Sequence, residues 1–140
     1  MKYDHILSLV SGITSKANQL IISELESKNI TGLAPSHGAI LYFLYQSETL
    51  SMMELAKKIN RDKSTLTALI KKLVRLGYVE KNKDPYDSRV TLVKLTKKAW
   101  DVKPDFDEIS DTLLERVYKD FKLKDKKEVI YALEKMLKNL

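Results

Sequence analysis

The sequence contains no cysteine, only two histidines, and four glycines that each stand alone among 140 residues. Without cysteine, the chain can form no disulfide, no thiolate metal cluster and no thiol-based redox switch. Because the glycines are scattered, no glycine-rich loop for cradling a nucleotide phosphate is present. We therefore expect no catalytic residue, no cofactor and no metal site, and we expect that the chain is not an enzyme.

The two histidines lie outside any catalytic or metal-binding motif. His37 opens a predicted helix beside Gly38, and a side chain at the start of a helix suits capping better than general-base chemistry. Sequence cannot disprove a Ser-His-Asp arrangement, yet no motif surrounds either histidine. We expect His5 and His37 to be surface or capping residues.

Long hydrophobic runs are also missing, since no stretch approaches the roughly 18 apolar residues of a membrane span. Residues 1–5 are too polar and acidic to open a secretory signal, and Ser8, Ser11 and Thr14 interrupt the apolar run that would have to follow. The composition, 44% hydrophobic and 31% charged, is that of a globular protein. These features predict a single globular unit with no membrane contact, located in the cytoplasm.

The net charge of +6 is unevenly distributed along the chain. Residues 1–46 are neutral, residues 47–94 carry eleven basic and six acidic side chains, and residues 95–140 have a net charge of +1. An excess of +5 in the middle third is typical of a module that binds a polyanion. When charge alone is considered, a solvated lysine-rich surface is the more common explanation.

Apolar residues at helical spacing predict a long amphipathic helix over residues 1–28. Pro35 and Ser36 open a second helix. A capping box formed by Ser51 and Glu54 opens a short third helix. Asp62 caps a fourth helix that ends at Gly77, and the tight link between the third and fourth helices predicts a helix-turn-helix.

The pattern then changes to strand-like alternation over residues 78–95, with a turn-rich tip at residues 82–87 that predicts a β-hairpin. Thr96 caps the next helix, which we expect Pro104 to bend near its start. Asp125 and Glu128 form a second capping box before the last helix. The predicted fold class is mainly α. A winged helix-turn-helix lobe (residues 30–96) carries a β-hairpin wing and is flanked by helical segments (residues 1–29 and 97–140).

The fourth helix has two distinct faces. Its apolar face holds Leu66, Leu69, Ile70 and Leu73. The opposite face is small, hydroxylated and basic, which suits an element that enters the DNA major groove: Ser64, Thr67, Ala68, Lys71 and Arg75. Near the helix start, Lys63 and Ser64 could bind phosphate with the help of free backbone amides. An ordinary surface helix with solvated lysines is the alternative.

The predicted hairpin is basic, with Lys81, Lys83, Arg89 and Lys94. Asp87 and Arg89 are two residues apart, which places them on the same side of an extended strand. In that arrangement the carboxylate can orient the guanidinium for the minor groove. A plain turn-stabilising ion pair explains these two residues equally well.

Three motifs together resemble the MarR family of winged-helix regulators, over nearly the whole chain. They are Glu54-Leu55-Ala56, then Ser64-Thr65-Leu66-Thr67 followed by Gly77-Tyr78-Val79, and finally Asp87-Ser88-Arg89 with Leu95-Thr96. The resemblance implies that Ser64, Thr65, Thr67 and Lys71 read the major groove, that Arg75 contacts the backbone, and that Arg89 enters the minor groove. The chain departs from the family pattern at Asn60-Arg61, at Ser88, where a second arginine is common, and at Ala99, where glycine is frequent.

The flanking helices carry more apolar surface than the lobe needs, so we expect them to form a homodimer. A dimer predicts a palindromic operator with half-sites about 10 base pairs apart. The resulting hypothesis is a sequence-specific DNA-binding transcriptional regulator, expected to be a repressor. By the family resemblance, a small amphipathic effector would bind near Tyr42, Tyr45, Trp100 and Phe106, although these aromatic residues also fit a plain core. The alternatives are a monomer with folded-back helices, an architectural DNA-binding protein and a protein-interaction module.

Overall fold

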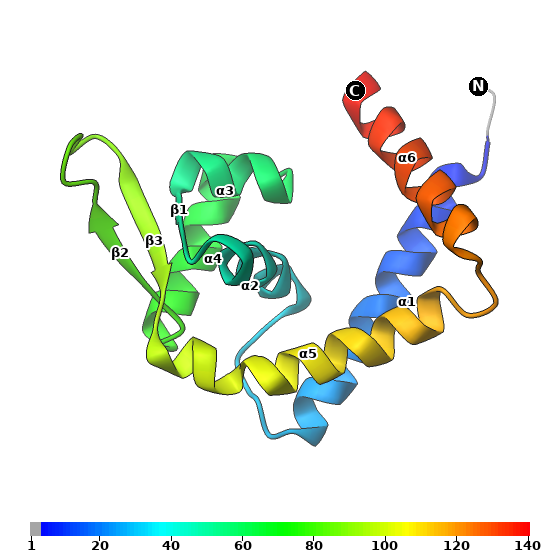
Figure 1. The fold of residues 1–140 in the computed structure, drawn as a ribbon, viewed down its shortest axis with the longest axis horizontal. Helices are drawn as coiled ribbons and strands as arrows, with labels where there is room; N and C mark the ends of the chain where they lie inside the picture. The colour runs from blue at the N-terminus through cyan, green and yellow to red at the C-terminus, as the bar shows by residue number, and fades with distance from the viewer. Residues whose placement is uncertain (1–3) are drawn as a thin grey trace.

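The computed structural model describes residues 4–140. Over that part of the chain it contains six helices and a three-stranded sheet (Figure 1). The elements follow in the order α1 (Ile6–Ser27), α2 (Pro35–Ser47), β1 (Thr49–Ser51), α3 (Met52–Ile59), α4 (Lys63–Arg75), β2 (Val79–Lys83), β3 (Thr91–Leu95), α5 (Lys97–Val117) and α6 (Leu123–Asn139). The predicted mainly helical fold with one hairpin is confirmed.

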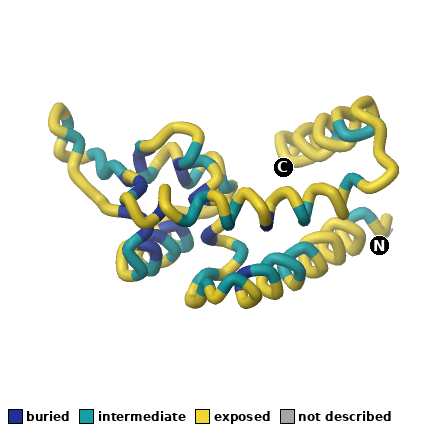
Figure 2. Tube along the Cα trace, turned by 60° about the horizontal axis from the view of Figure 1, so that its bottom comes forward, coloured by how far each residue is buried: buried dark blue, intermediate teal, exposed yellow. Residues whose placement is uncertain are grey.

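The core lies in the lobe that α2, α3, α4 and the sheet form together. The largest fully buried side chains there are Ile40, Leu44, Leu55, Leu66, Ile70, Leu73, Val79 and Val93. Figure 2 shows most of the buried positions gathered in this part of the molecule. The exposed face of α4 is therefore held in place by a packed core.

The sheet has the strand order β1-β3-β2, and both pairings are antiparallel. The predicted hairpin is β2 and β3, with Val79 opposite Leu95 and Lys83 opposite Thr91. Strand β2 continues through Asn82 and Lys83, which the sequence pattern assigns to the turn, so the tip spans residues 84–90 instead. The pattern does not predict strand β1, because three residues are too few to show a period.

Three of the predicted helix starts are confirmed in atomic detail. The Glu54 amide donates to Ser51 Oγ at 3.1 Å while the Ser51 amide donates to Glu54 Oε1 at 3.0 Å, which completes the capping box. The Thr65 amide donates to Asp62 Oδ1 at 2.7 Å. Thr96 Oγ1 accepts from the Ala99 amide. Between α3 and α4, Asn60 has a φ of 56°, a left-handed conformation that asparagine tolerates well.

The capping box expected at Asp125 and Glu128 is wrong. Helix α6 begins earlier, after Lys122, and Asp125 accepts a hydrogen bond of 3.0 Å from the Lys122 amide. Asp125 therefore serves the first turn from its third position, while Glu128 lies 3.8 Å from Lys124 Nζ. A carboxylate can satisfy free amides from either position, so the residue type alone does not fix the helix start.

At the other end of the chain, α1 starts at Ile6 rather than at the beginning of the predicted range, and residues 1–3 of that range lie outside the described residues. Helix α5 runs as one helix from Lys97 to Val117, through Pro104. Both helices extend away from the lobe, with α6 at the far end (Figure 1). Lys28 joins α1 to α5 through an ion pair of 2.6 Å with Glu108.

Within residues 4–140, none of the helices has the length and apolar character needed to cross a membrane. The flanking helices nevertheless expose many large apolar side chains, and no residue of α6 is buried in the described chain. Figure 2 shows this exposure along most of α6.

Candidate nucleic-acid interface

Helix α4 separates its side chains as the sequence predicts. Leu66, Ile70 and Leu73 are buried in the core, and Leu69 is half-buried. The residues proposed to meet DNA are exposed, with one exception: Lys63, Ser64, Thr67, Ala68, Lys71 and Arg75. The exception is Thr65, which is half-buried and is therefore less accessible than the other residues of this set.

Two hydroxyl groups on the exposed face already use their donor hydrogens within the helix. Ser64 Oγ donates to Asp62 Oδ1 at 2.9 Å, and Thr67 Oγ1 donates to the Lys63 carbonyl oxygen at 2.8 Å. A hydroxyl that donates internally still offers its oxygen lone pairs to an external donor. In the major groove, the exocyclic amino groups of adenine and cytosine are such donors.

The amino-terminal end of α4 is less open to phosphate than the sequence suggests. The Asp62 carboxylate accepts the Thr65 amide and the Ser64 hydroxyl, and these bonds hold the pKa of Asp62 below its usual value. One of the free amides proposed for phosphate is thus occupied by an ionised side chain. Lys63 remains exposed beside it.

The wing carries its basic side chains on exposed positions. Lys81 and Lys83 lie on β2, and Lys94 lies on β3 directly opposite Glu80. Lys83 Nζ donates to the Ser88 carbonyl oxygen at 3.2 Å, which links the end of β2 to the far side of the tip. Ser88 therefore contributes a backbone contact to the wing, and its side chain is exposed.

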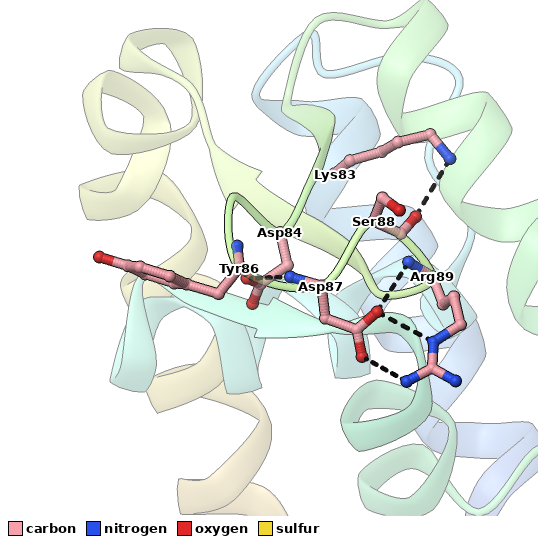
Figure 3. Close-up of polar contacts among 6 residues, drawn as sticks. All are labelled: Lys83, Asp84, Tyr86, Asp87, Ser88 and Arg89. Atoms are coloured by element: carbon pink, nitrogen blue, oxygen red, sulfur yellow. Dashed lines mark hydrogen bonds and ion pairs between the residues drawn. The ribbon is translucent and has the colours of Figure 1, made fainter.

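Asp87 and Arg89 form the pair that the sequence suggests, but in a different backbone setting (Figure 3). Asp87 Oδ1 accepts from the Arg89 amide at 3.0 Å and from Nε at 3.1 Å, while Oδ2 accepts from Nη2 at 3.2 Å. The expected extended strand is wrong, because both residues lie in the turn between β2 and β3. The hydrogen bond from the Arg89 backbone amide to the Asp87 carboxylate, rather than strand alternation, brings the two side chains together.

This pair sets the direction of the Arg89 side chain. The Arg89 side chain, followed by its amide, lowers the pKa of Asp87 below the usual range, so the carboxylate stays ionised at neutral pH. The guanidinium is bound on one edge and the Arg89 side chain is 89% exposed. A cation in this state is available to a phosphate or a groove while its orientation is already set.

Comparisons with known proteins agree with this geometry. The sequence matches the family model of the MarR family over residues 31–90. It is 31% identical to the transcriptional regulator AdcR of Streptococcus pneumoniae over 98 residues, which cover 65% of this chain and 67% of that protein. A MarR protein from Peptoclostridium difficile superposes with a TM-score of 0.84 and 27% identity, covering 99% of this chain and 89% of the other. The chain belongs to the MarR family of transcriptional regulators.

Other relatives extend this picture. The HTH-type regulator YdgJ of Bacillus subtilis is 38% identical over 66 residues, which cover 47% of this chain and 40% of that protein. The chain thus spans less than half of that relative's length. A mutant of Escherichia coli MarR, solved in complex with operator DNA, has a TM-score of 0.78 and 23% identity, covering 93% of this chain and 91% of the other. At that identity the likeness concerns the fold.

A cavity of about 650 Å³ lies between the lobe and the flanking helices of this MarR-family chain. Tyr42, Tyr45 and Phe106 line it, whereas Trp100 does not. Trp100 instead packs edge-on against Tyr45, with ring centroids 5.3 Å apart. Burial raises the pKa of the Tyr45 phenol, which donates to the Ala99 carbonyl oxygen. Three of the four aromatic residues proposed for an effector therefore meet in one space.

The capping role expected for His37 is confirmed. His37 is only 3% exposed, and its Nδ1 accepts a hydrogen bond of 2.9 Å from the Ala34 amide at the start of α2. Burial, and secondarily the charge of Lys72 on α4, lower the pKa of His37. The histidine is therefore neutral at physiological pH. Its Nε2 is buried with no hydrogen-bond partner among the described residues.

Proposed function

We propose that this MarR-family regulator binds a specific DNA sequence as a homodimer, with α4 in the major groove and Arg89 in the minor groove. The observation that carries the proposal is the oriented and exposed Arg89 on the same rigid lobe as the exposed, hydroxylated and basic face of α4. The mutant E. coli MarR, which shares the fold, was solved in complex with operator DNA, and this supports DNA as the partner.

The charge of the lobe also favours DNA. Four of the six acidic residues between positions 47 and 94 accept hydrogen bonds from backbone amides, and are therefore tied to caps and turns: Glu54, Asp62, Asp84 and Asp87. The cations proposed to meet DNA on α4 and the wing are exposed, in contrast: Lys63, Lys71, Arg75, Lys81, Lys83 and Arg89. Such a surface attracts a polyanion at long range, and its contacts release counterions from the duplex.

The homodimer is supported by the exposed apolar side chains on the flanking helices. On α6 and its ends they are Leu123, Val129, Ile130, Tyr131, Leu133, Met136, Leu137 and Leu140, and on α1 they include Leu7, Leu9, Val10 and Ile13. Helices in proteins gain most of their stability from tertiary packing, and no residue of α6 is buried in the described chain, so these faces need a partner. A second copy presents the same apolar faces, related to the first by a two-fold axis. For binding to two half-sites, the two α4 helices would then lie about 34 Å apart.

The cavity supports a regulatory step. It is lined by the flanking helices α1 and α5 and by α2 of the lobe. We expect a small amphipathic ligand in this space to alter the spacing of the two lobes and release DNA, so that the protein acts as a repressor. Tyr42, Tyr45 and Phe106 would supply the apolar contacts, and Lys103, which also lines the space, would supply a charge.

Selection from a randomised duplex library at two salt concentrations, followed by sequencing, tests the proposed DNA binding. We expect a two-fold symmetric site with half-sites about 10 base pairs apart, and retention that falls steeply with salt. Retention without enrichment would replace the proposal with architectural DNA binding. Failure to retain any duplex at low salt would point to a protein-interaction module instead.

A further inference from the structure

The most exposed large hydrophobic residue of the wing is one that the motifs do not single out. Tyr86 is 97% exposed at the tip between β2 and β3. Figure 3 shows its ring and the Arg89 guanidinium pointing to opposite sides of the tip. If Arg89 contacts a duplex from one side of the tip, Tyr86 can contact it from the other side.

The backbone that carries Tyr86 is held by a compact set of hydrogen bonds. The Tyr86 and Asp87 amides both donate to Asp84 Oδ1, at 2.8 and 3.3 Å. The Asp84 amide donates to the Val90 carbonyl oxygen at 2.9 Å, and the Val90 amide donates to the Asp87 carbonyl oxygen at 3.0 Å. Pro85, next to Tyr86, has a fixed φ as well. Binding would therefore order only the two side-chain torsions of the tyrosine.

The chemistry of the side chain matches one part of a duplex. A tyrosine combines a flat apolar ring with a hydroxyl donor, so it can lie on a deoxyribose while the hydroxyl reaches a phosphate oxygen. The neighbouring carboxylates have donors within the tip itself: Asp84 Oδ1 accepts two backbone amides, and Asp87 is paired with Arg89.

We propose that Tyr86 is a second DNA-binding residue of the wing, contacting the sugar-phosphate backbone beside the minor groove that receives Arg89. This inference rests on the proposed DNA-binding function. The contact is uncharged, so it adds affinity without releasing a counterion. Because sugars and phosphates carry no base identity, the contact positions the wing without selecting a sequence.

The experiment compares variants on the duplex that the wild-type protein selects from a randomised library. Affinity is measured by fluorescence anisotropy over a series of salt concentrations for wild type, Tyr86→Phe, Tyr86→Ala and Arg89→Ala. Tyr118→Phe is the matched control, because it removes a hydroxyl from a half-buried tyrosine at the end of α5, outside the wing. Melting curves establish that the variants are folded, which we expect because the Tyr86 side chain is almost fully exposed.

We expect Tyr86→Phe to weaken binding about fivefold, as for a lost hydrogen bond, and Tyr86→Ala to weaken it about tenfold or more. The slope of log affinity against log salt should stay that of the wild type, whereas Arg89→Ala should flatten it by about one ion. A duplex of unrelated sequence should lose the same factor. Tyr118→Phe should bind as the wild type does.

Binding of Tyr86→Ala within about twofold of wild type, while Arg89→Ala is weakened, would overturn the role of Tyr86 and leave the DNA-binding function intact. A flattened salt slope in Tyr86→Ala would also overturn it, because the loss would then come from displaced cations. If the wild-type protein selects no duplex, the proposed function itself fails.

Discussion

Lys98 Nζ donates a hydrogen bond of 2.6 Å to the carbonyl oxygen of Leu76, the residue that closes α4. The ammonium group also lies 4.5 Å from the centre of the Tyr78 ring. A helix ends in unsatisfied carbonyls with a partial negative charge, so a cation at this position stabilises the end of α4. Thr96 Oγ1 adds a second link by donating to the Gly77 carbonyl oxygen at 2.6 Å. The first turn of α5 is thus bonded to the end of the helix proposed to read DNA.

Replacing Lys98 with methionine keeps the side-chain stem and removes the donor and the charge. We expect the free energy of unfolding to fall by about 0.5–1 kcal/mol, the usual effect of a cation at a helix end. We also expect weaker DNA binding, because the end of α4 becomes less firmly held. Lys97→Met is the control, since Lys97 pairs with Asp101 on the same helix. Equal urea midpoints for the two variants would contradict the link.

Arg89→Ala should weaken DNA binding by more than about 1 kcal/mol, as expected for the loss of a charge-assisted contact. The fold should be unchanged, because the Arg89 side chain is 89% exposed. Anisotropy with the selected duplex measures the affinity, and circular dichroism confirms the folding. Wild-type affinity in this variant would remove the wing from the interface.

Asp87→Asn separates orientation from charge. Removing a negative charge near DNA should strengthen binding if only the net charge matters. If the carboxylate orients Arg89 through Nε and Nη2, the same substitution should weaken binding, by about threefold, because the guanidinium loses its bidentate partner. The direction of the change is the result. Tighter binding by Asp87→Asn would show that Asp87 does not position the arginine.

His37 should make the stability of the lobe depend on pH. Its pKa in the folded protein lies below the ordinary value of 6.5, so the folded state favours the neutral form. The full stability is then present above pH 6.5 and decreases as the pH falls below that value, because the unfolded chain binds the proton more tightly. His37→Gln keeps a side chain that can accept the Ala34 amide but does not titrate, so thermal melts between about pH 7.5 and 5 should show a weaker decrease. The control His5→Gln should behave as the wild type, and an unchanged slope in His37→Gln would assign the effect to other groups.

Leu133→Glu should convert the proposed dimer to a monomer. Leu133 is 40% exposed on α6, and a buried carboxylate without a partner strongly disfavours an apolar interface. We expect light scattering to show the monomeric mass and DNA affinity to fall by about 100-fold, because the second half-site no longer adds to the first. Lys135→Glu, at an exposed position of the same helix, controls for the added carboxylate. A dimeric Leu133→Glu variant would place the interface elsewhere.

The caps of α3, α4 and α5 could be predicted because each of them joins residues that are three positions apart. Ser51 with Glu54, Asp62 with Thr65, and Thr96 with Ala99 all form within one turn of helix. The same short range explains the error at Asp125, where a carboxylate serves the first turn from inside the helix. Local hydrogen bonding specifies that a helix starts there, but not at which residue.

The order of the helices and the hairpin, the two faces of α4, and the family to which the chain belongs could all be predicted from the sequence. Periodicity, capping and turn chemistry act over a few neighbouring residues, so they can be seen before the chain folds. The contacts between distant segments, in contrast, are set by the packing of the folded chain. Strand β1 forms because Thr49 meets Lys94, and Lys98 reaches Leu76 from 22 positions away. Trp100 packs against Tyr45 and does not line the cavity, because its position depends on how α5 lies against the lobe. Such contacts depend on how whole elements pack, and no local pattern encodes which two surfaces will meet.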